Sequence, residues 1–238
     1  MLFQKLKSMK NVALKTIYLA ALSVFMISCD KDDDVETNKA NLMVVHASPN
    51  APAVDVRIDN SVVLSNVPYP ANSDYLSTTA GSTNIKISPT STTTYVIDAN
   101  VNLEANKNYS VFAIDSVSKI KAAVVPDDLT TPSAGKAHVR FFHFSPNAPA
   151  VDIAVSGGPV LFSNRNFNDQ TANTTAVNFT PVDANSYNLE VRLSGESTVV
   201  LSLPGVTLTP GKIYTVFAKG FVGGVGAQAL GAQIIENN

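Results

Sequence analysis

The stretch Val44–Asp59 reads VVHASPNAPAVDVRID and decides which fold this sequence predicts. An apolar run leads into a turn with two prolines, whose fixed φ angles favour a tight change of direction. After the turn, Val54, Val56 and Ile58 alternate with charged residues. This period of two is typical of a β-strand that buries one face. The stretch therefore predicts two strands joined by a rigid turn.

The same stretch returns later in the chain. HASPNAPAVD at His46–Asp55 and HFSPNAPAVD at His143–Asp152 agree at nine of ten positions. A second matching pair is KNYSVFA at 107–113 and KIYTVFA at 212–218. The distance along the chain between matching residues is 97 in the first pair and 105 in the second. Each repeating unit is thus about 90 to 100 residues long, which is larger than solenoid repeats of about 20 to 50 residues. We expect two tandem domains, the second with eight extra residues.

The apolar pattern within each unit favours strands throughout. Tyr187–Leu193 alternates as cleanly as the opening stretch, whereas Tyr109–Ile114 and Val199–Leu203 are apolar at both parities and predict strands covered on each face. Beyond the N-terminus no helical stripe of useful length is found, and turn residues recur at spacings typical of sandwiches. We expect an all-β chain of two immunoglobulin-like domains, each with about seven strands in two antiparallel sheets.

The sequence predicts five parts along the chain. A stretch rich in strand breakers separates the two repeating units and predicts a short linker. The expected parts are a lipoprotein signal peptide at 1–28, an acidic tether at 29–40, a first β-sandwich at 41–128, a linker at 129–136 and a second β-sandwich at 137–238.

The N-terminus predicts export. Four lysines precede Thr16–Ser28, a run of 13 residues without a charge. A helix needs about 20 apolar residues to span a bilayer, so a cleaved signal peptide is favoured. The run ends in MISC and resembles the lipobox of bacterial lipoproteins, which implies that Cys29 is lipidated and becomes the new N-terminus. The alternative is a plain secretory peptide cleaved nearby.

The residues after Cys29 favour a surface location. They resemble the export signal that sends Bacteroidota-type lipoproteins to the outer face of the outer membrane, and the residues concerned are Asp30, Lys31, Asp32, Asp33 and Asp34. A plain acidic spacer is the alternative. An EF-hand starting at Asp30 fails, because Val35 and Asn41 stand where glycine and an acid are needed. We expect a lipid-anchored protein of the outer membrane that faces the extracellular side, with the periplasmic face as the alternative.

Composition excludes several classes of protein. The chain has 238 residues, of which 45% are hydrophobic and 15% charged, with a single cysteine. These values exclude a disordered chain, a disulfide scaffold and a multi-span membrane protein. Without the four N-terminal lysines, 13 basic residues face 19 acidic ones, so the mature net charge is about −6. Nucleic acid is therefore not an expected partner.

Two sets of segments carry a family resemblance. The first repeating unit resembles the bacterial domain-of-unknown-function family 4397 in three segments, VVHASPNAPAVDVRID, LSNVPYPANSDYL and LEANKNYSVFAI. The second unit resembles it again in FFHFSPNAPAVDIAV, LFSNRNF and LTPGKIYTVFAKG. The resemblance covers nearly all of 41–238 and implies surface or secreted β-sandwich domains without an assigned reaction. In many members, glycine follows the aromatic residue of the middle segment, which is LSNVPYPANSDYL in the first unit and LFSNRNF in the second. Here Pro70 follows Tyr69 and Asn168 follows Phe167, which leaves the conformation of that loop open.

Each copy of the turn motif contains His, Ser and Asp, the residue types of a catalytic triad. No nucleophile elbow surrounds either serine, and the proline that follows it lacks the N–H of an oxyanion donor. His46 shares the parity of Leu42 and Val44, so we expect it to end a core-facing strand and to bond the turn, while the aspartates are expected to be solvated or turn-bonding. We predict no catalytic residues and assign structural roles to His46, Ser48, Pro49, Asp55, His143, Ser145, Pro146 and Asp152.

Neither a metal nor a cofactor is expected. The chain has three histidines, and His138 and His143 differ by an odd number, which places them on opposite faces of one strand. A calcium ion bound by loop carboxylates is left open.

The first functional hypothesis is a non-enzymatic adhesion or binding module, held on the membrane through Cys29, with a glycan or surface-protein ligand. The second is a glycan-binding accessory lipoprotein that uses Tyr69, Tyr75 and Phe167 as stacking residues. The test is whether these three rings share one solvent-facing plane. The loop 164–178 is the expected variable contact surface.

The third hypothesis is an envelope hydrolase that uses His143 and Ser145. A structure in which Ser145 is buried would remove this hypothesis.

Overall fold

The computed structural model describes residues 38–238. The described residues belong to one compact unit. The expected signal peptide, Cys29 and most of the tether lie outside the described residues. Within the described part, no helix is long and apolar enough to cross a membrane.

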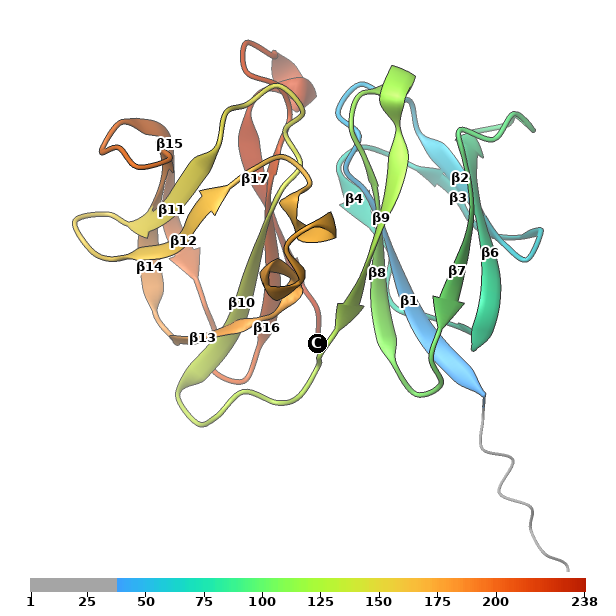
Figure 1. The fold of residues 1–238 in the computed structure, drawn as a ribbon, viewed down its shortest axis with the longest axis horizontal. Coiled ribbons are helices and arrows are strands. Elements are labelled where there is room, and N and C mark those ends of the chain that lie inside the picture. The colour runs from blue at the N-terminus through green and yellow to red at the C-terminus, as the bar shows by residue number, and fades with distance from the viewer. Residues whose placement is uncertain (1–37) are drawn as a thin grey trace, which may run out of the picture. The chain divides into compact units, whose positions relative to one another are not determined.

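The first repeating unit folds into two packed sheets (Figure 1). Its β2–β3 hairpin turns at Asp59 and Asn60, which both have positive φ, as the two-residue turn favoured in hairpins requires. The elements are β1 (Lys39–His46), β2 (Val54–Ile58), β3 (Ser61–Val67), β4 (Ala71–Asn72), β5 (Leu76–Thr79), β6 (Gly81–Pro89), β7 (Ile97–Leu103), β8 (Asn108–Ile114), the 3-10 helix η1 (Val117–Lys119) and β9 (Lys121–Asp127).

The second repeating unit has the same sheet orders as the first, and it has three short 3-10 helices where the first has one. The prediction of an all-β sandwich fold is confirmed. The elements are β10 (Lys136–His143), β11 (Val151–Val155), β12 (Val160–Arg165), η2 (Asp169–Thr171), η3 (Thr174–Val177), β13 (Thr180–Asp183), β14 (Ser186–Leu193), β15 (Val199–Thr207), β16 (Ile213–Lys219), η4 (Gly226–Gln228) and β17 (Gly231–Glu236).

The sheets repeat one topology. The orders are β4-β1-β8-β9 and β3-β2-β6-β7 in the first sandwich, and β13-β10-β16-β17 and β12-β11-β14-β15 in the second. One pair in each sandwich, β1 with β8 and β10 with β16, is parallel, whereas the expectation was antiparallel throughout. Parallel neighbours cannot be joined by a hairpin. The chain therefore visits the opposite sheet between the two strands of each pair.

The first sandwich has nine strands and the second has eight, where about seven were expected. The additional strands are short. β5 and the two-residue β4 both pair with the same edge of β1, and β13 covers the corresponding edge of β10. Such short segments shield a sheet edge without needing a long alternating pattern, so the sequence signal for them is weak.

Each sandwich has its own apolar core, and the strands of the parallel pairs are also buried on their outer face. Val111 and Ala113 of β8 lie in the first core, while Phe112 and Ile114 point into a different cluster. The interpretation of Tyr109–Ile114 as a strand covered on both faces is thus correct.

The same interpretation of Val199–Leu203 is wrong. This segment lies in β15, at the edge of its sheet, and Val199 and Val200 are exposed. A strand that is apolar at both odd and even positions can be covered on both faces or can lie at the exposed edge of a sheet, and the apolar pattern alone does not distinguish the two.

Candidate functional site

The two histidines of the repeated motif are fully buried and hold the turn that follows them. His46 Nε2 lies 3.0 Å from the Pro52 carbonyl oxygen, and His143 Nε2 lies 3.0 Å from that of Pro149. A carbonyl only accepts, so Nε2 carries the hydrogen in both rings. Burial lowers the pKa of both histidines, although the bonds to these carbonyls partly oppose it. Both rings are therefore neutral at pH 7.

The motif serines are also buried. Ser48 Oγ donates to the Asp115 carbonyl at 2.6 Å. Ser145 Oγ has no hydrogen-bond partner among the described residues, and the whole residue is inaccessible to solvent. Ser145 Oγ is therefore not presented to solvent, where a nucleophile would meet its substrate.

Asp55 and Asp152 bind backbone groups of neighbouring loops and turns. Asp55 accepts from the N–H of Asn66 at 2.9 Å and of Ser91 at 3.1 Å. Asp152 likewise accepts from two backbone N–H groups, those of Asn164 and Gly195. Both residues are buried, so the expectation of a turn-bonding acid fits and that of a solvated acid does not.

The role of Asp55 predicts a pH-dependent stability. The N–H groups of Asn66, and then of Ser91, lower its pKa in the folded protein. Because this pKa is lower in the folded than in the unfolded protein, the ionised carboxylate stabilises the folded state above the unfolded-state pKa of about 3.9. This stabilisation is lost as pH falls through the folded-state pKa. Asp55→Asn should therefore lower the melting temperature at pH 7, with a difference from wild type that shrinks below about pH 4.

Circular dichroism melts from about pH 2 to pH 8 measure this difference. The exposed Asp74→Asn is the control for the change in net charge. A difference between Asp55→Asn and wild type that is constant across the range would contradict the assigned role.

The three candidate stacking rings do not form a solvent-facing plane. Tyr75 and Phe167 pack against a buried apolar cluster, and the Tyr75 hydroxyl donates to Asp127. Tyr69 contacts the His46 ring edge-on, with centroids 5.8 Å apart. Burial raises the pKa of Tyr69 to about 12. All three residues are partly buried and already contact other protein groups, which disfavours an open stacking platform. Their role as ligand contacts stays a prediction.

The loop after two of these rings differs between the copies. The Tyr69–Pro70 peptide bond is cis, whereas Asn168, which follows Phe167, has a φ of 56°. Asparagine tolerates this left-handed region better than most residues. The two copies thus continue from the aromatic residue with different backbone conformations, into β4 in the first copy and into η2 in the second.

A third apolar cluster lies between the two sandwiches. It combines side chains from β1, β8 and β9 with side chains from β10, β16 and β17. Phe112 is at its centre, with ring centroids 5.5 Å from Phe142 and 5.0 Å from Phe144. We call it the interface cluster, and its buried members are Met43, Val45, Ala47, Phe112, Ile114, Ala123, Val125, Phe142, Phe144, Phe217 and Ile235.

The interface cluster uses corresponding positions of the two copies. The repeat alignment pairs Phe112 with Phe217, and Val125 with Ile235. Contact through the same patch on both partners is the geometry of an isologous dimer interface. Here both partners belong to one chain.

A buried ion pair completes this interface. Arg140 of β10 and Asp127 of β9 are 2.5 Å apart, and both side chains are 0% exposed. Arg140 also donates from Nε to Thr215 at 2.9 Å and stacks over the Phe179 ring. The second carboxylate oxygen of Asp127 accepts from Tyr75 at 2.6 Å and from Ser110 at 2.7 Å. Both charges are thus fully bonded, as burial requires.

Sequence reasoning missed this pair, although a signal was present. Arg140 is the one Arg or Lys in the segment HVRFFHF, and it has the parity of Phe142. A charge at a buried parity of a strand implies a buried partner. That partner, Asp127, stands at the other end of the interdomain linker, and no local pattern identifies it.

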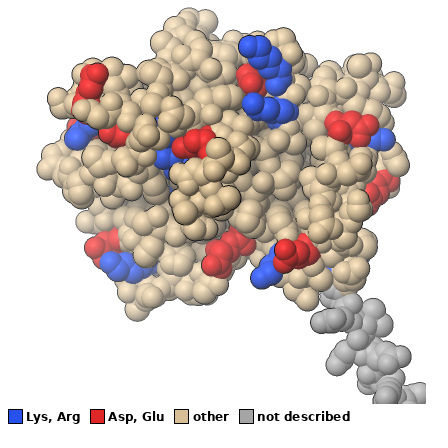
Figure 2. All heavy atoms as spheres, viewed as in Figure 1, with Lys and Arg blue, Asp and Glu red and all other residues tan. Residues whose placement is uncertain are grey.

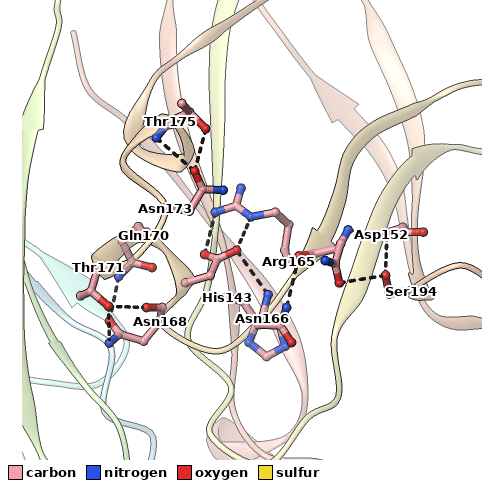
Figure 3. A network of polar contacts seen from close by, with 12 residues as sticks. His143, Asp152, Arg165, Asn166, Asn168, Gln170, Thr171, Asn173, Thr175 and Ser194 are labelled. Carbon is pink, nitrogen blue, oxygen red and sulfur yellow. Dashed lines mark hydrogen bonds and ion pairs between the residues drawn. The ribbon is translucent and has the colours of Figure 1, made fainter.

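The loop 164–178 is held in place by its own polar contacts. Arg165 donates twice to Asp169, at 2.7 and 2.9 Å. Figure 3 shows further links, from Asn168 to Gln170 and Thr171 and from Asn173 to Thr175. The stretch 171–175 is exposed. The loop thus presents amide and hydroxyl groups from an ordered scaffold.

Surface charges show no single-sign field on the face drawn in Figure 2, where Lys and Arg lie beside Asp and Glu in small groups. Within residues 38–238, no three His, Cys, Asp or Glu side chains gather in a way that could hold a metal ion.

Comparison with protein families gives one match. Residues 40–154 match the family model described as Domain of unknown function (DUF4397). The DUF4397 match covers the first sandwich and continues through β10 into β11, so it includes both Asp127 and Arg140. The predicted resemblance is confirmed for this one copy. A comparison with the curated proteins found no match.

Proposed function

We propose that this protein is a non-enzymatic binding or adhesion module that is displayed on a cell surface by a lipid anchor. One observation carries the proposal: the histidines and aspartates of the repeated motif are bonded to backbone groups of the protein itself. His46 and His143 hold a carbonyl, and Asp55 and Asp152 hold backbone N–H groups. A motif used in this way supports a scaffold.

The interface between the sandwiches supports a role in display. A buried ion pair and a cluster of phenylalanines hold the two halves in one arrangement. A rigid pair of sandwiches loses little freedom when a partner binds its loops, which favours binding. The exposed polar segment 171–175 is the contact surface we favour.

The remaining parts of the proposal concern the N-terminus and the second unit. We propose that Cys29 carries the acyl chains, that the acidic residues after it direct a Bacteroidota-type lipoprotein to the outer face of the outer membrane, and that the second unit is a further copy of DUF4397. Its strand order, which equals that of the first unit, supports the last point.

Anchoring is tested by labelling cells with radioactive palmitate. Wild type should incorporate label and fractionate with the outer membrane, and Cys29→Ala should lose both properties. Label that persists in Cys29→Ala would contradict the anchor.

Binding is tested separately with the fragment Glu36–Asn238 on glycan and surface-protein arrays. We expect a ligand whose binding falls at least tenfold when Thr171 and Asn173 are both changed to alanine. Wild-type hydrolysis of ester, peptide or glycoside substrates above the level of Ser145→Ala would contradict the non-enzymatic proposal.

A further inference from the structure

The second sandwich contains an apolar cavity of about 340 Å³ between its two sheets. Val151, Val191 and Leu201 line it from one sheet, and His143 and Ala218 line it from the other. Ten of the twelve lining residues have apolar side chains, and none is charged. Ligand sites in proteins typically have volumes from about 300 Å³ upward and are mostly apolar with few polar groups. The cavity meets both criteria.

The cavity lies where the two copies differ. The segment between β16 and β17 has eleven residues, whereas the corresponding segment between β8 and β9 has six. The longer segment folds tightly: a Cβ at Gly220, whose φ is +80°, would lie 2.1 Å from the Ala229 carbonyl oxygen. An ordered, glycine-dependent loop therefore borders the cavity in the second copy.

The walls differ as well. The strand registers place Ile87 and Ile97 of the first sandwich where the second has Val191 and Leu201. Ile97 is buried, whereas Leu201 is only partly buried. At this position the second sandwich is therefore more open to solvent than the first.

The mouth of the cavity is apolar and open to solvent. Val200 and Val222 line the cavity and are 40% and 49% exposed, and Val225, in the same loop as Val222, is 83% exposed. Contiguous exposed apolar surface is a feature of ligand-binding grooves. The exposed valines also disfavour entry of a charged molecule.

A single polar side chain lines the cavity. His143 uses its Nε2 hydrogen for the Pro149 carbonyl, which leaves Nδ1 as an acceptor. Nδ1 has no hydrogen-bond partner among the described residues, whereas the corresponding atom of His46 accepts from the Ser48 N–H at 3.4 Å. A buried acceptor without a donor is costly. The second copy thus keeps a neutral acceptor beside an apolar space.

From these observations we infer that the second sandwich binds a small, uncharged and predominantly apolar molecule in this cavity. An engineered cavity of about 150 Å³ holds benzene, so a volume of about 340 Å³ suits two fused rings or a molecule of similar size. The inference goes beyond the proposed function and is independent of the lipid anchor and of any surface ligand.

The test titrates the fragment Glu36–Asn238 with 1-naphthol by calorimetry, with charged 1-naphthoate as the comparison. 1-Naphthol should bind, and 1-naphthoate should bind at least tenfold more weakly, because no counter-charge lines the cavity. No 1-naphthol binding at about 1 mM, or equal binding of both compounds, would overturn the inference.

Two pairs of variants locate the binding. Ala148→Phe fills the cavity and should weaken 1-naphthol binding at least tenfold, while Ala51→Phe, the same change at the corresponding position of the first sandwich, should not. Val200→Glu at the mouth repeats the test with an exposed residue, and Val62→Glu on the exposed edge of the first sandwich is its control. Undiminished binding in folded Ala148→Phe or in Val200→Glu would place the ligand elsewhere and overturn the inference.

Discussion

Asp127→Ala should lower the free energy of unfolding by about 3–5 kcal/mol, because it leaves the guanidinium of Arg140 buried without a counter-charge. Both side chains are completely inaccessible in the folded protein. The substitution also removes the acceptor of the Tyr75 and Ser110 hydroxyls. Urea unfolding followed by circular dichroism at pH 7 measures the loss. An unchanged midpoint would show that this pair does not hold the interface.

The repeat itself supplies the control for this experiment. Met43 stands at the position of Arg140 in the first copy, and Asn237 stands at the position of Asp127 in the second. The double variant Arg140→Met with Asp127→Asn removes both charges, so we expect it to recover most of the stability. A double variant as unstable as Asp127→Ala would rule out the stranded charge as the cause.

A surface pair gives the matched comparison. Lys136 and Asp183 are 2.7 Å apart, but the Asp183 side chain is 76% exposed. Asp183→Ala should change the free energy of unfolding by no more than about 1 kcal/mol, because solvent screens such pairs.

Phe112→Ala should also destabilise the protein by about 3–5 kcal/mol, the usual cost of removing a buried ring. The ring belongs to the first sandwich but packs on Phe142, Phe144 and Phe217 of the second. The loss should therefore reach both halves. Hydrogen exchange read by mass spectrometry should become faster in β16 as well as in β8.

Phe221→Ala is the control for this substitution. Its ring is partly buried in a loop and lies outside the three apolar clusters, so the change should cost about 1 kcal/mol. If Phe112→Ala left the exchange of β16 unchanged, the two sandwiches would be energetically separate.

Much of the fold could be predicted because its signals are local. The alternation in Val54–Ile58 and the prolines of the turn identify strands and turns from neighbouring residues alone. Parity also placed His46 on a core-facing strand end, and it is buried there. The duplication then doubled each of these signals.

The interface and the cavity could not be predicted, because they depend on which surfaces meet. Phe112 and Phe142 are apolar residues in apolar strands, and nothing in either segment identifies the other as its partner. Val199–Leu203 has the composition of a covered strand but lies at an edge. Tyr75 stands in a polar stretch that suggests exposure, yet its hydroxyl is bonded to Asp127. Each of these errors concerns contacts between segments distant in sequence.

The two sandwiches form one folded block around the interface cluster and the Arg140–Asp127 pair. Scanning calorimetry of the fragment Glu36–Asn238 tests it most directly. We expect one transition whose calorimetric enthalpy equals the van 't Hoff enthalpy. Two separate transitions, or a calorimetric enthalpy about twice the van 't Hoff value, would contradict it.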